Sequence, residues 1–292
     1  MITLTYQGAT MEVSLKGGEL RRYTNKDGRE CLWSGDPYAW TGVAPVLFPT
    51  IGALKNQTVL IENKAFSIPK HGLVRHMPFT VHEQGPDFIT LCVTQTEETK
   101  ACYPFDFAFF VTHRFVENGF ETILKIENHS DRTMPFIVGG HPAFSCPMKE
   151  GESFEEYVVE FEKPEEGRSL LMATGGILSG EEIVPLGENH RTLSLDYSAF
   201  DKRDTYVFSD INSRSISLIH KDTRKGIKVS FPTAPVLAVW TMTNKKAPYL
   251  CIEPWEGLPA LENETGHFED KPYCIKLDMG KSYSFSYKMQ EI

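Results

Sequence analysis

Hydrophobic and polar residues alternate along much of the chain. Close to its C-terminal end, Tyr283, Phe285, Tyr287 and Met289 are separated by serines and by Lys288. Successive side chains of a β-strand point to opposite faces, so this period of two predicts a half-buried strand.

The alternation returns over residues 107–115 and 120–126, and Glu117, Asn118 and Gly119 lie between the two runs. Asn-Gly accepts the backbone conformation of a tight turn, so the two runs predict a β-hairpin. Shorter runs rich in β-branched and aromatic residues also predict strands. They cover residues 2–6, 11–15, 59–61, 79–81, 88–94, 157–161, 205–208, 216–220, 227–231 and 236–241.

Apolar stripes with helical periodicity are absent from every window of about 12 residues, and only residues 37–40 predict a helical turn. We therefore expect an all-β fold, built as large stacked antiparallel sheets with a few short helical turns. The chain has no linker rich in proline, serine or glycine and no exact repeat. Residues 1–292 are therefore expected to form a single β-sandwich domain.

The chain carries 39 acidic and 30 basic side chains in 292 residues, which gives a net charge of −9. This charge argues against nucleic acid and anionic membranes as partners. No segment reaches the roughly 20 apolar residues that cross a bilayer, and the N-terminal residues lack the pattern of a signal peptide. We therefore expect a cytoplasmic protein whose six scattered cysteines are free thiols.

The motifs of several large enzyme classes are absent from the sequence. It contains no G-x-G-x-x-G, no G-x-x-x-x-G-K-[ST], no H-E-x-x-H and no G-x-S-x-G. The sequence therefore contains none of the motifs that usually indicate dinucleotide binding, a P-loop, a zinc protease or an α/β-hydrolase. The cysteines and histidines also lack zinc-finger spacing, so no metal site is expected.

Four segments place glycine and proline around a titratable residue. They are residues 45–54 (PVLFPTIGAL), 70–75 (KHGLVR), 139–147 (GGHPAFSCP) and 251–257 (CIEPWEG). Each interrupts a β pattern where a loop is expected to emerge. Because loops on a rigid scaffold usually carry binding and catalytic groups, these segments hold the candidate functional residues.

His141 follows Gly139 and Gly140 at the end of a predicted strand over residues 134–138. The glycines allow another group to approach closely, and Pro142 restrains His141 to extended backbone. A single histidine in this setting is either a structural hydrogen-bonding group or an acid–base catalyst.

Glu253 follows the apolar run of residues 249–252 and precedes Pro254. Burying a carboxylate costs free energy unless it is paired with a cation or hydrogen-bonded. Glu253 is therefore either salt-bridged at a sheet rim or functional. Trp255 is either part of the core or an apolar surface for a sugar ring.

His71 and Arg75 are a candidate donor pair for the hydroxyl groups of a ligand. On local sequence alone, Lys55, Asp204 and Glu256 are more simply read as solvated surface charges.

Together these segments resemble the aldose 1-epimerase (galactose mutarotase) family, in particular its LacX-like branch and the related hexose-6-phosphate epimerases. The resemblance covers nearly the whole chain and rests on short features in one order. These are GGEL, LWSGDPYAW, APVLFPTIGAL, KHGLVR, GGHPAF and LCIEPWEG, followed by an aromatic closing strand.

The resemblance implies a large antiparallel β-supersandwich that binds a pyranose and interconverts the anomers of an aldohexose or related sugar, without a cofactor or a metal. It makes His141 the general acid and Glu253 the general base. It also makes His71 a sugar contact and matches Asp204 to a sugar-binding aspartate. The expected partner is a small-molecule sugar, and the expected state is a monomer or homodimer.

The sequence departs from the galactose-specific branch around the histidine and the glutamate, so the resemblance does not select galactose. Arg75 matches the arginine of H-G-x-x-R in the phosphate-recognising branch, whose other arginines have no counterpart found here. Lys55 is a candidate substitute. A hexose 6-phosphate is therefore an alternative substrate.

The implied mechanism requires that His141 and Glu253 meet at one sugar. Both should open into one polar, aromatic-lined cleft, separated by room for a pyranose ring. A nearby carboxylate should raise the pKa of His141. Three other functions stay open: a non-catalytic sugar-binding protein, an interaction module, and a glycoside hydrolase or lyase that pairs Glu253 with Glu256 or Asp204.

Overall fold

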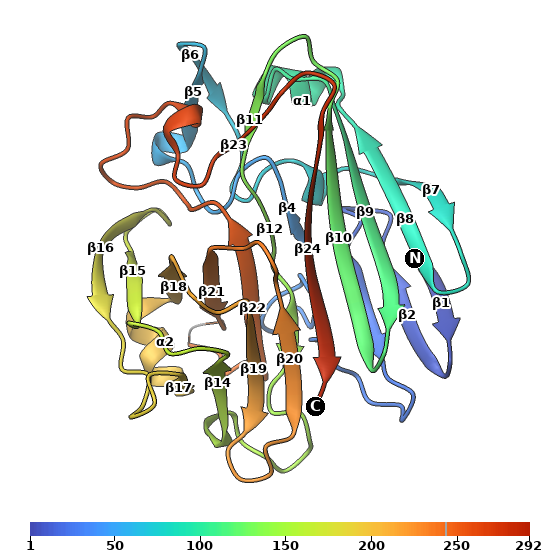
Figure 1. Cartoon of the computed structure of the whole chain (residues 1–292), viewed down its shortest axis with the longest axis vertical. Coiled ribbons are helices and arrows are strands. Elements are labelled where there is room, and N and C mark those ends of the chain that lie inside the picture. The colour runs from blue at the N-terminus through green and yellow to red at the C-terminus, as the bar shows by residue number, and fades with distance from the viewer. Residues whose placement is uncertain (243) are drawn as a thin grey trace.

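The computed structural model describes residues 1–242 and 244–292, and it confirms the predicted all-β fold. The largest sheet has nine strands in the order β17-β14-β19-β20-β24-β10-β9-β8-β7 (Figure 1). In that order the strands are β17 (Thr192–Ser194), β14 (Tyr157–Phe161), β19 (Ser215–His220), β20 (Gly226–Ser230), β24 (Ser282–Glu291), β10 (Gly119–Asn128), β9 (Phe107–Val116), β8 (Phe88–Thr94) and β7 (Thr80–Gln84).

A second sheet has eight strands. Seven of them follow the order β16-β15-β18-β21-β22-β12-β4, and β13 also pairs with β22. Their bounds are β16 (Leu178–Ile183), β15 (Arg168–Met172), β18 (Thr205–Ser209), β21 (Val236–Trp240), β22 (Tyr249–Glu256), β12 (Val138–Gly140), β4 (Val46–Leu47) and β13 (Ala143–Ser145). The smaller sheets join β1 (Ile2–Tyr6), β2 (Ala9–Val13) and β3 (Leu20–Thr24); β5 (Thr58–Ile61) and β6 (Lys64–Ser67); and β11 (Met134–Phe136) and β23 (Ile275–Leu277).

Helices are short throughout the described residues. α1 (Glu97–Cys102) begins after Thr96, whose hydroxyl accepts a hydrogen bond from the Thr99 amide, and α2 (Tyr197–Arg203) begins after Asp196. Four 3₁₀ turns cover Lys55–Gln57, Val74–His76, Phe154–Glu156 and Phe268–Asp270. None of these helices has both the length and the apolar character that a bilayer crossing demands.

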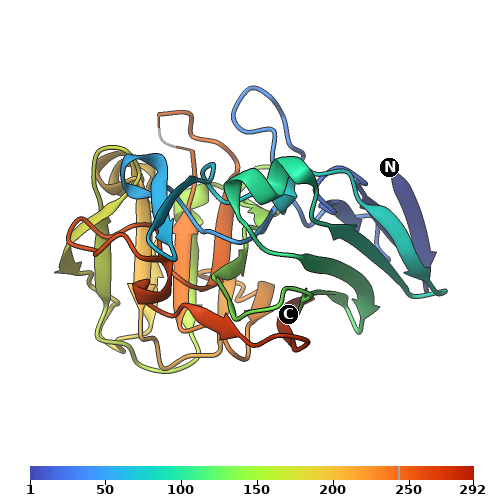
Figure 2. The same ribbon diagram turned by 90° about the horizontal axis from the view of Figure 1, so that it is seen from above.

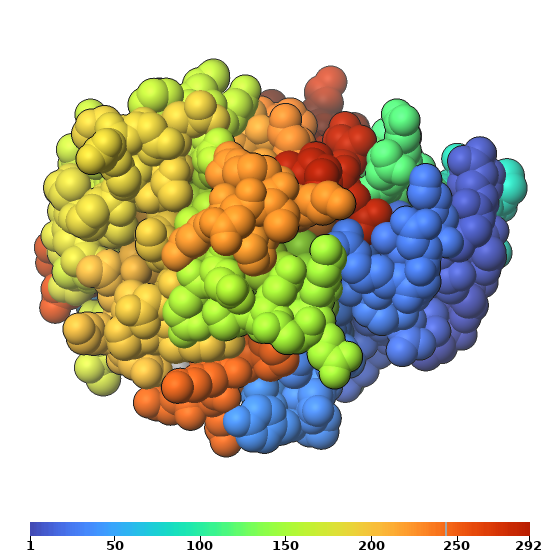
Figure 3. Space-filling view, turned by 90° about the horizontal axis from the view of Figure 1, so that it is seen from below, coloured from blue at the N-terminus to red at the C-terminus, as the bar shows by residue number. Residues whose placement is uncertain are grey.

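The clearest sequence patterns are confirmed. β9 and β10 form the predicted hairpin, with Phe115 opposite Phe120. The alternating C-terminal segment is β24, and it pairs with β10 on one side and β20 on the other. It thereby joins the two halves of the nine-stranded sheet, and the dark blue N-terminal strands and the yellow strands lie at opposite ends of the molecule (Figures 2 and 3).

Aromatic packing anchors the segment 45–54 in the core. Phe48 follows β4 of the eight-stranded sheet, and its ring centroid lies 5.2 Å from Phe107 and 5.1 Å from Phe109. Those two rings come from β9 of the nine-stranded sheet. All three side chains are fully buried. This segment is therefore held by contacts between the two sheets, which makes it a rigid support for the site.

The segment 251–257 corrects one sequence expectation, because most of it is strand and not loop. β22 continues to Glu256 and pairs along its length with β21. Pro254 is tolerated because the strand pairing on the other side of β22 is interrupted between β13 and β12, although the Ile252 amide still donates to the Pro142 carbonyl. Glu253 consequently lies inside a sheet and not at its rim.

His113 on β9 predicts an acid-sensitive fold. Its Nε2 donates to the Gly18 carbonyl over 2.8 Å, and its Nδ1 accepts from the Thr122 hydroxyl over 3.0 Å. Burial lowers the pKa of His113 from 6.5 to about 4. His113 is protonated more easily in the unfolded chain than in the folded one. The contribution of the buried, neutral His113 to the free energy of unfolding is therefore complete above pH 6.5 and is lost as the pH falls toward 4.

Between pH 6.5 and pH 4, the free energy of unfolding should fall by about 3 kcal/mol less in His113→Gln than in the wild type. Urea unfolding at a series of pH values measures the slope, which is informative even if the variant is less stable overall. His82→Gln, at an exposed histidine, is the control. Equal slopes in wild type and His113→Gln would contradict the assignment.

Candidate functional site

His141 is placed by close packing around the two glycines before it. A Cβ at Gly140 would lie 2.4 Å from the Tyr287 ring, and one at Gly139 would lie 2.6 Å from the Trp255 ring. Neither contact leaves room for a side chain, so β12 runs between these rings only as glycine. His141 follows directly, as predicted, and its amide donates to the Pro45 carbonyl over 3.0 Å.

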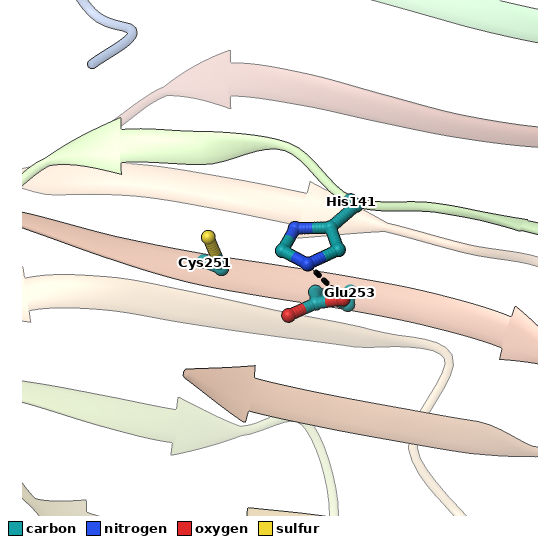
Figure 4. A group of neighbouring side chains, drawn as sticks. All are labelled: His141, Cys251 and Glu253. Carbon is teal, nitrogen blue, oxygen red and sulfur yellow. Dashed lines mark ion pairs between the residues drawn. The ribbon is translucent and has the colours of Figure 1, made fainter. Parts of the chain in front are cut away.

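Glu253 lies beside His141. The two residues are 112 positions apart in sequence (253 − 141), yet His141 Nε2 lies 3.2 Å from Glu253 Oε2 (Figure 4). Only 7% of His141 and 1% of Glu253 is exposed. The expected cleft is present, but the expected room for a pyranose between the two groups is wrong. A sugar has to meet both groups from the same side.

The pair opens into a cavity of about 310 Å³, which is close to the lower limit for small-molecule sites. The structure brings His71, Arg75, Asp204 and Trp255 to this cavity together with the pair. The remaining lining residues are Trp40, Gly52, Lys70, Met172, Thr205, Trp240, Met242 and Pro259.

Lys55 is not brought to the cavity. Its Nζ instead donates to the Glu262 carbonyl over 2.6 Å. A different cation, Lys70, lines the cavity together with Arg75. Lys70 directly precedes His71 in the KHGLVR segment, and this position could have identified it as a cavity residue. The role expected for Lys55 therefore finds no support, and Lys70 is the better candidate.

His71 is fixed as a hydrogen-bond donor toward the cavity. Its Nδ1 accepts from the Gly52 amide over 3.2 Å, and its own amide donates to the Gly52 carbonyl over 2.9 Å. Burial, reinforced by His141 and by Lys70, lowers the pKa of His71 well below 6.5. The ring is therefore neutral, and its one N–H is on Nε2.

Two tryptophans that local sequence did not single out surround the His141 ring. The centroid of Trp40 lies 4.9 Å away and that of Trp240 lies 5.7 Å away. Glu19 supports this wall, because its Oε1 accepts from the backbone amides of Val43 and Ala44, just after Trp40. Two features of the sequence could have identified them: Trp40 is the last residue of the LWSGDPYAW segment, and Trp240 lies at the end of the predicted strand over residues 236–241, which is β21.

Burial changes the proton affinities of the central pair. Burial, followed by the Arg75 guanidinium, lowers the pKa of His141 from 6.5 to about 3. The expectation that a neighbouring carboxylate raises this pKa is wrong, because the loss of solvation is the largest influence and lowers it. Burial also raises the pKa of Glu253 well above 4.5, although Lys70 and Arg75 oppose the rise. Both groups therefore favour their neutral forms.

Glu256 faces away from the cavity. It lies three residues after Glu253, so its side chain is on the opposite face of β22, where it accepts from the Tyr283 hydroxyl of the nine-stranded sheet. Asp204, in contrast, lines the cavity, and its Oδ2 accepts from the Thr205 hydroxyl over 2.8 Å. The carboxylate pair Glu253 and Glu256 expected of a glycoside hydrolase is therefore not formed.

Comparisons with known proteins agree with this architecture. The family model described as aldose 1-epimerase matches residues 1–290. The plasmid-encoded protein LacX of Lactococcus lactis subsp. lactis is 34% identical over 283 residues, which cover 94% of each chain.

Two solved structures have TM-scores of 0.92 with this chain. One is a galactose mutarotase related enzyme from Lactobacillus acidophilus, 27% identical and covering 100% of this chain and 97% of its own. The other is a galactose mutarotase-like protein from Lactobacillus casei ATCC 334, 26% identical and covering 100% of both chains. The fold is thus that of the galactose mutarotase-like proteins.

Proposed function

The chain belongs to the aldose 1-epimerase family, and we propose that it interconverts the α and β anomers of an aldohexose with Glu253 as the base and His141 as the acid. One observation carries the proposal. A carboxyl and an imidazole lie 3.2 Å apart and open into a cavity lined by hydrogen-bonding groups. We further propose that residues 1–292 act as one catalytic domain.

Anomer exchange requires the sugar ring to open, rotate about C1–C2 and close on the other face of C1. During opening, a base removes the proton of the anomeric hydroxyl while an acid protonates the ring oxygen. Both oxygens are bonded to C1, so adjacent protein groups suit the two transfers. Closure uses the same groups with their roles reversed, and no covalent intermediate is needed.

The pair can supply one acid and one base although each group favours its neutral form. A neutral imidazole beside a protonated carboxyl holds as many protons as an imidazolium beside a carboxylate. The two forms differ only by a proton moved across the 3.2 Å gap. Hydroxyl groups of a bound sugar would stabilise the charged form, because they replace part of the solvation that burial removes.

Other cavity residues supply candidate contacts for the remaining hydroxyls. His71 offers its Nε2–H, and Asp204 offers carboxylate oxygens. Trp255 Nε1 is buried and has no hydrogen-bond partner among the described residues. Buried donors are rarely left unpaired, so a sugar hydroxyl is the partner that we assign to this N–H. Such contacts would hold C1 against the catalytic pair.

The pH profile of kcat/KM tests the assigned protonation states. The active pair holds one transferable proton, and a second proton enters at His141 only near its lowered pKa of about 3. Loss of the single proton is governed by the raised pKa of Glu253. We therefore expect a bell-shaped profile without an inflection near pH 6.5, the ordinary pKa of histidine.

Initial mutarotation rates, followed by polarimetry at several pH values and corrected for spontaneous mutarotation, provide this measurement. His82→Asn, at an exposed histidine that packs on Phe110, serves as the control. An inflection near pH 6.5 that persists in His82→Asn and vanishes in His141→Asn would contradict the lowered pKa.

The activity itself is tested with a panel of free hexoses and pentoses. Polarimetry should show faster approach to anomeric equilibrium for at least one of them. Binding of a sugar without any acceleration would favour the non-catalytic sugar-binding alternative. Release of reducing ends from an oligosaccharide would instead favour a glycosidase that uses Glu253 with Asp204.

A hexose 6-phosphate is a second candidate substrate, and the distribution of cations favours it. A neighbouring cavity of about 290 Å³ shares Arg75 and Trp40 with the sugar cavity and is also lined by Lys16, Arg21, His76 and Glu19. Glu19 pairs with Arg21 over 3.0 Å, which leaves Lys16 and Arg75 as the cations available to a phosphate. Including 6-phosphates in the panel separates the candidates, since Arg75→Met should raise the KM of a 6-phosphate more than that of the free hexose.

A further inference from the structure

His141 and Glu253 form a cluster of three potential metal ligands together with Cys251. Cys251 and Glu253 are two residues apart on β22, so their side chains share the face that His141 approaches (Figure 4). One potential ligand atom from each of the three lies within 4.8 Å of the other two. All three residues are buried. No zinc-finger spacing is present in the sequence, because His141 is 110 positions from Cys251 (251 − 141).

Two polar atoms of this group have no hydrogen-bond partner within the described part of the chain. They are His141 Nδ1 and Glu253 Oε2, and both are buried. Glu253 Oε2 lies 3.2 Å from His141 Nε2, but the two atoms are not aligned for a hydrogen bond. Buried polar atoms of folded proteins nearly always have a partner, so each unpaired one needs an explanation. A ligand that accepts lone pairs from nitrogen, oxygen and sulfur at one point would explain both atoms.

We propose that His141, Cys251 and Glu253 bind a thiophilic divalent cation of the Zn²⁺ class. Zinc sites that bind water or substrate have three protein ligands and an open fourth position. His141 and Glu253 line the cavity, so the fourth position of a metal held by the three residues would face it. On binding, the Cys251 thiol releases its proton to solvent as the metal–sulfur bond forms, and the metal loses bound water. The thiolate and the carboxylate balance the two positive charges, which offsets repulsion from Lys70 and Arg75 at the same cavity.

The cation would occupy the site in place of the sugar. Metal coordination uses lone pairs of His141 and Glu253, so neither group can then transfer a proton. This part of the inference rests on the proposed function. It makes the metal a reversible inhibitor that competes with the sugar and not a cofactor. Cys251 takes no part in the proton transfers, so its substitution separates metal binding from catalysis.

Titration with Co²⁺ provides a direct test. The full chain, freed of metal with a chelator, should bind one Co²⁺ with the near-ultraviolet absorption of a thiolate–cobalt bond. This absorption should be absent in Cys251→Ala and in the closer match Cys251→Ser. It should persist in Cys102→Ser, because Cys102 is a partly exposed thiol on α1 outside the cavity.

Mutarotation supplies the second readout. Zn²⁺ should inhibit the wild type, and excess sugar or a chelator should relieve the inhibition. In Cys251→Ala, mutarotation should persist and the inhibitory concentration of Zn²⁺ should rise at least about 100-fold, since loss of even outer-shell partners weakens metal binding about 10–100-fold.

The outcomes distinguish failure of the metal site from failure of the proposed function. Absence of the thiolate–cobalt absorption in the wild type, or its persistence in both Cys251 variants, overturns the metal site whatever the activity. If the chain accelerates no mutarotation, a cobalt absorption that depends on Cys251 still supports the metal site, and the proposed function alone fails.

Discussion

Replacing Glu253 with glutamine should lower kcat for mutarotation by about 10²- to 10⁴-fold. The amide has nearly the size of the carboxyl and keeps the packing of β22, but it cannot accept the proton of the anomeric hydroxyl. KM should change much less, because the remaining cavity contacts stay in place. Polarimetry with the best sugar of the panel measures both constants.

Loss of folding would not explain such a result. Burial raises the pKa of Glu253 in the folded chain, so the stability of the wild type is full below pH 4.5 and falls as the pH rises through the raised pKa. Glutamine carries no ionisable proton and removes this fall. The variant should therefore unfold at a urea concentration no lower than the wild type at neutral pH.

Glu256→Gln is the matched control for Glu253→Gln. It changes a buried carboxyl of the same strand that faces the opposite side, where it contacts Tyr283. We expect Glu256→Gln to retain kcat per folded molecule even if its stability falls. Full activity in Glu253→Gln, or equal losses of kcat in the two variants, would contradict the role of Glu253 as base.

Replacing His141 with asparagine should lower kcat by a similar factor of about 10²- to 10⁴-fold, because an amide cannot deliver a proton to the ring oxygen. The smaller side chain also leaves space beside Trp40 and Trp240, so some rise in KM is expected. The same polarimetric assay measures this variant.

His82→Asn is the control for the loss of a histidine, because His82 is exposed and packs on Phe110 away from the cavity. Its kcat should equal that of the wild type. If His141→Asn kept the wild-type kcat, the acid would have to be another group, and His71 would be the first candidate because its Nε2–H is already fixed as a donor.

The strands could be predicted where one face is buried and the other exposed. β9, β10 and β24 show this alternation over long runs. The hairpin of β9 and β10 was predicted and is confirmed, whereas the pairing of β24 with β10 could not be predicted from local sequence. β15 and β16 escaped prediction. Their segments RSLLM and LSGEEI carry no regular alternation. Their conformation depends instead on pairing, of β15 with β18 and of β16 with β15.

The site was predictable only in part. His141, Glu253, His71 and Arg75 could be proposed because short segments with glycine and proline set them apart. The 3.2 Å approach of His141 to Glu253 and the pKa shifts of these two residues could not be predicted. Both depend on sheet pairing between distant segments and on burial. Lys55 and Lys70 show the same limit, since local sequence does not say which lysine reaches the cavity.

The double variant His141→Asn, Glu253→Gln tests most directly whether the two side chains act together on one sugar. Groups that act as a unit lose most of their effect with the first substitution, so effects of the two changes are far from additive. We predict that the double variant has a kcat within a few-fold of the slower single variant. A kcat reduced by the product of the two single effects would contradict joint action at one anomeric centre.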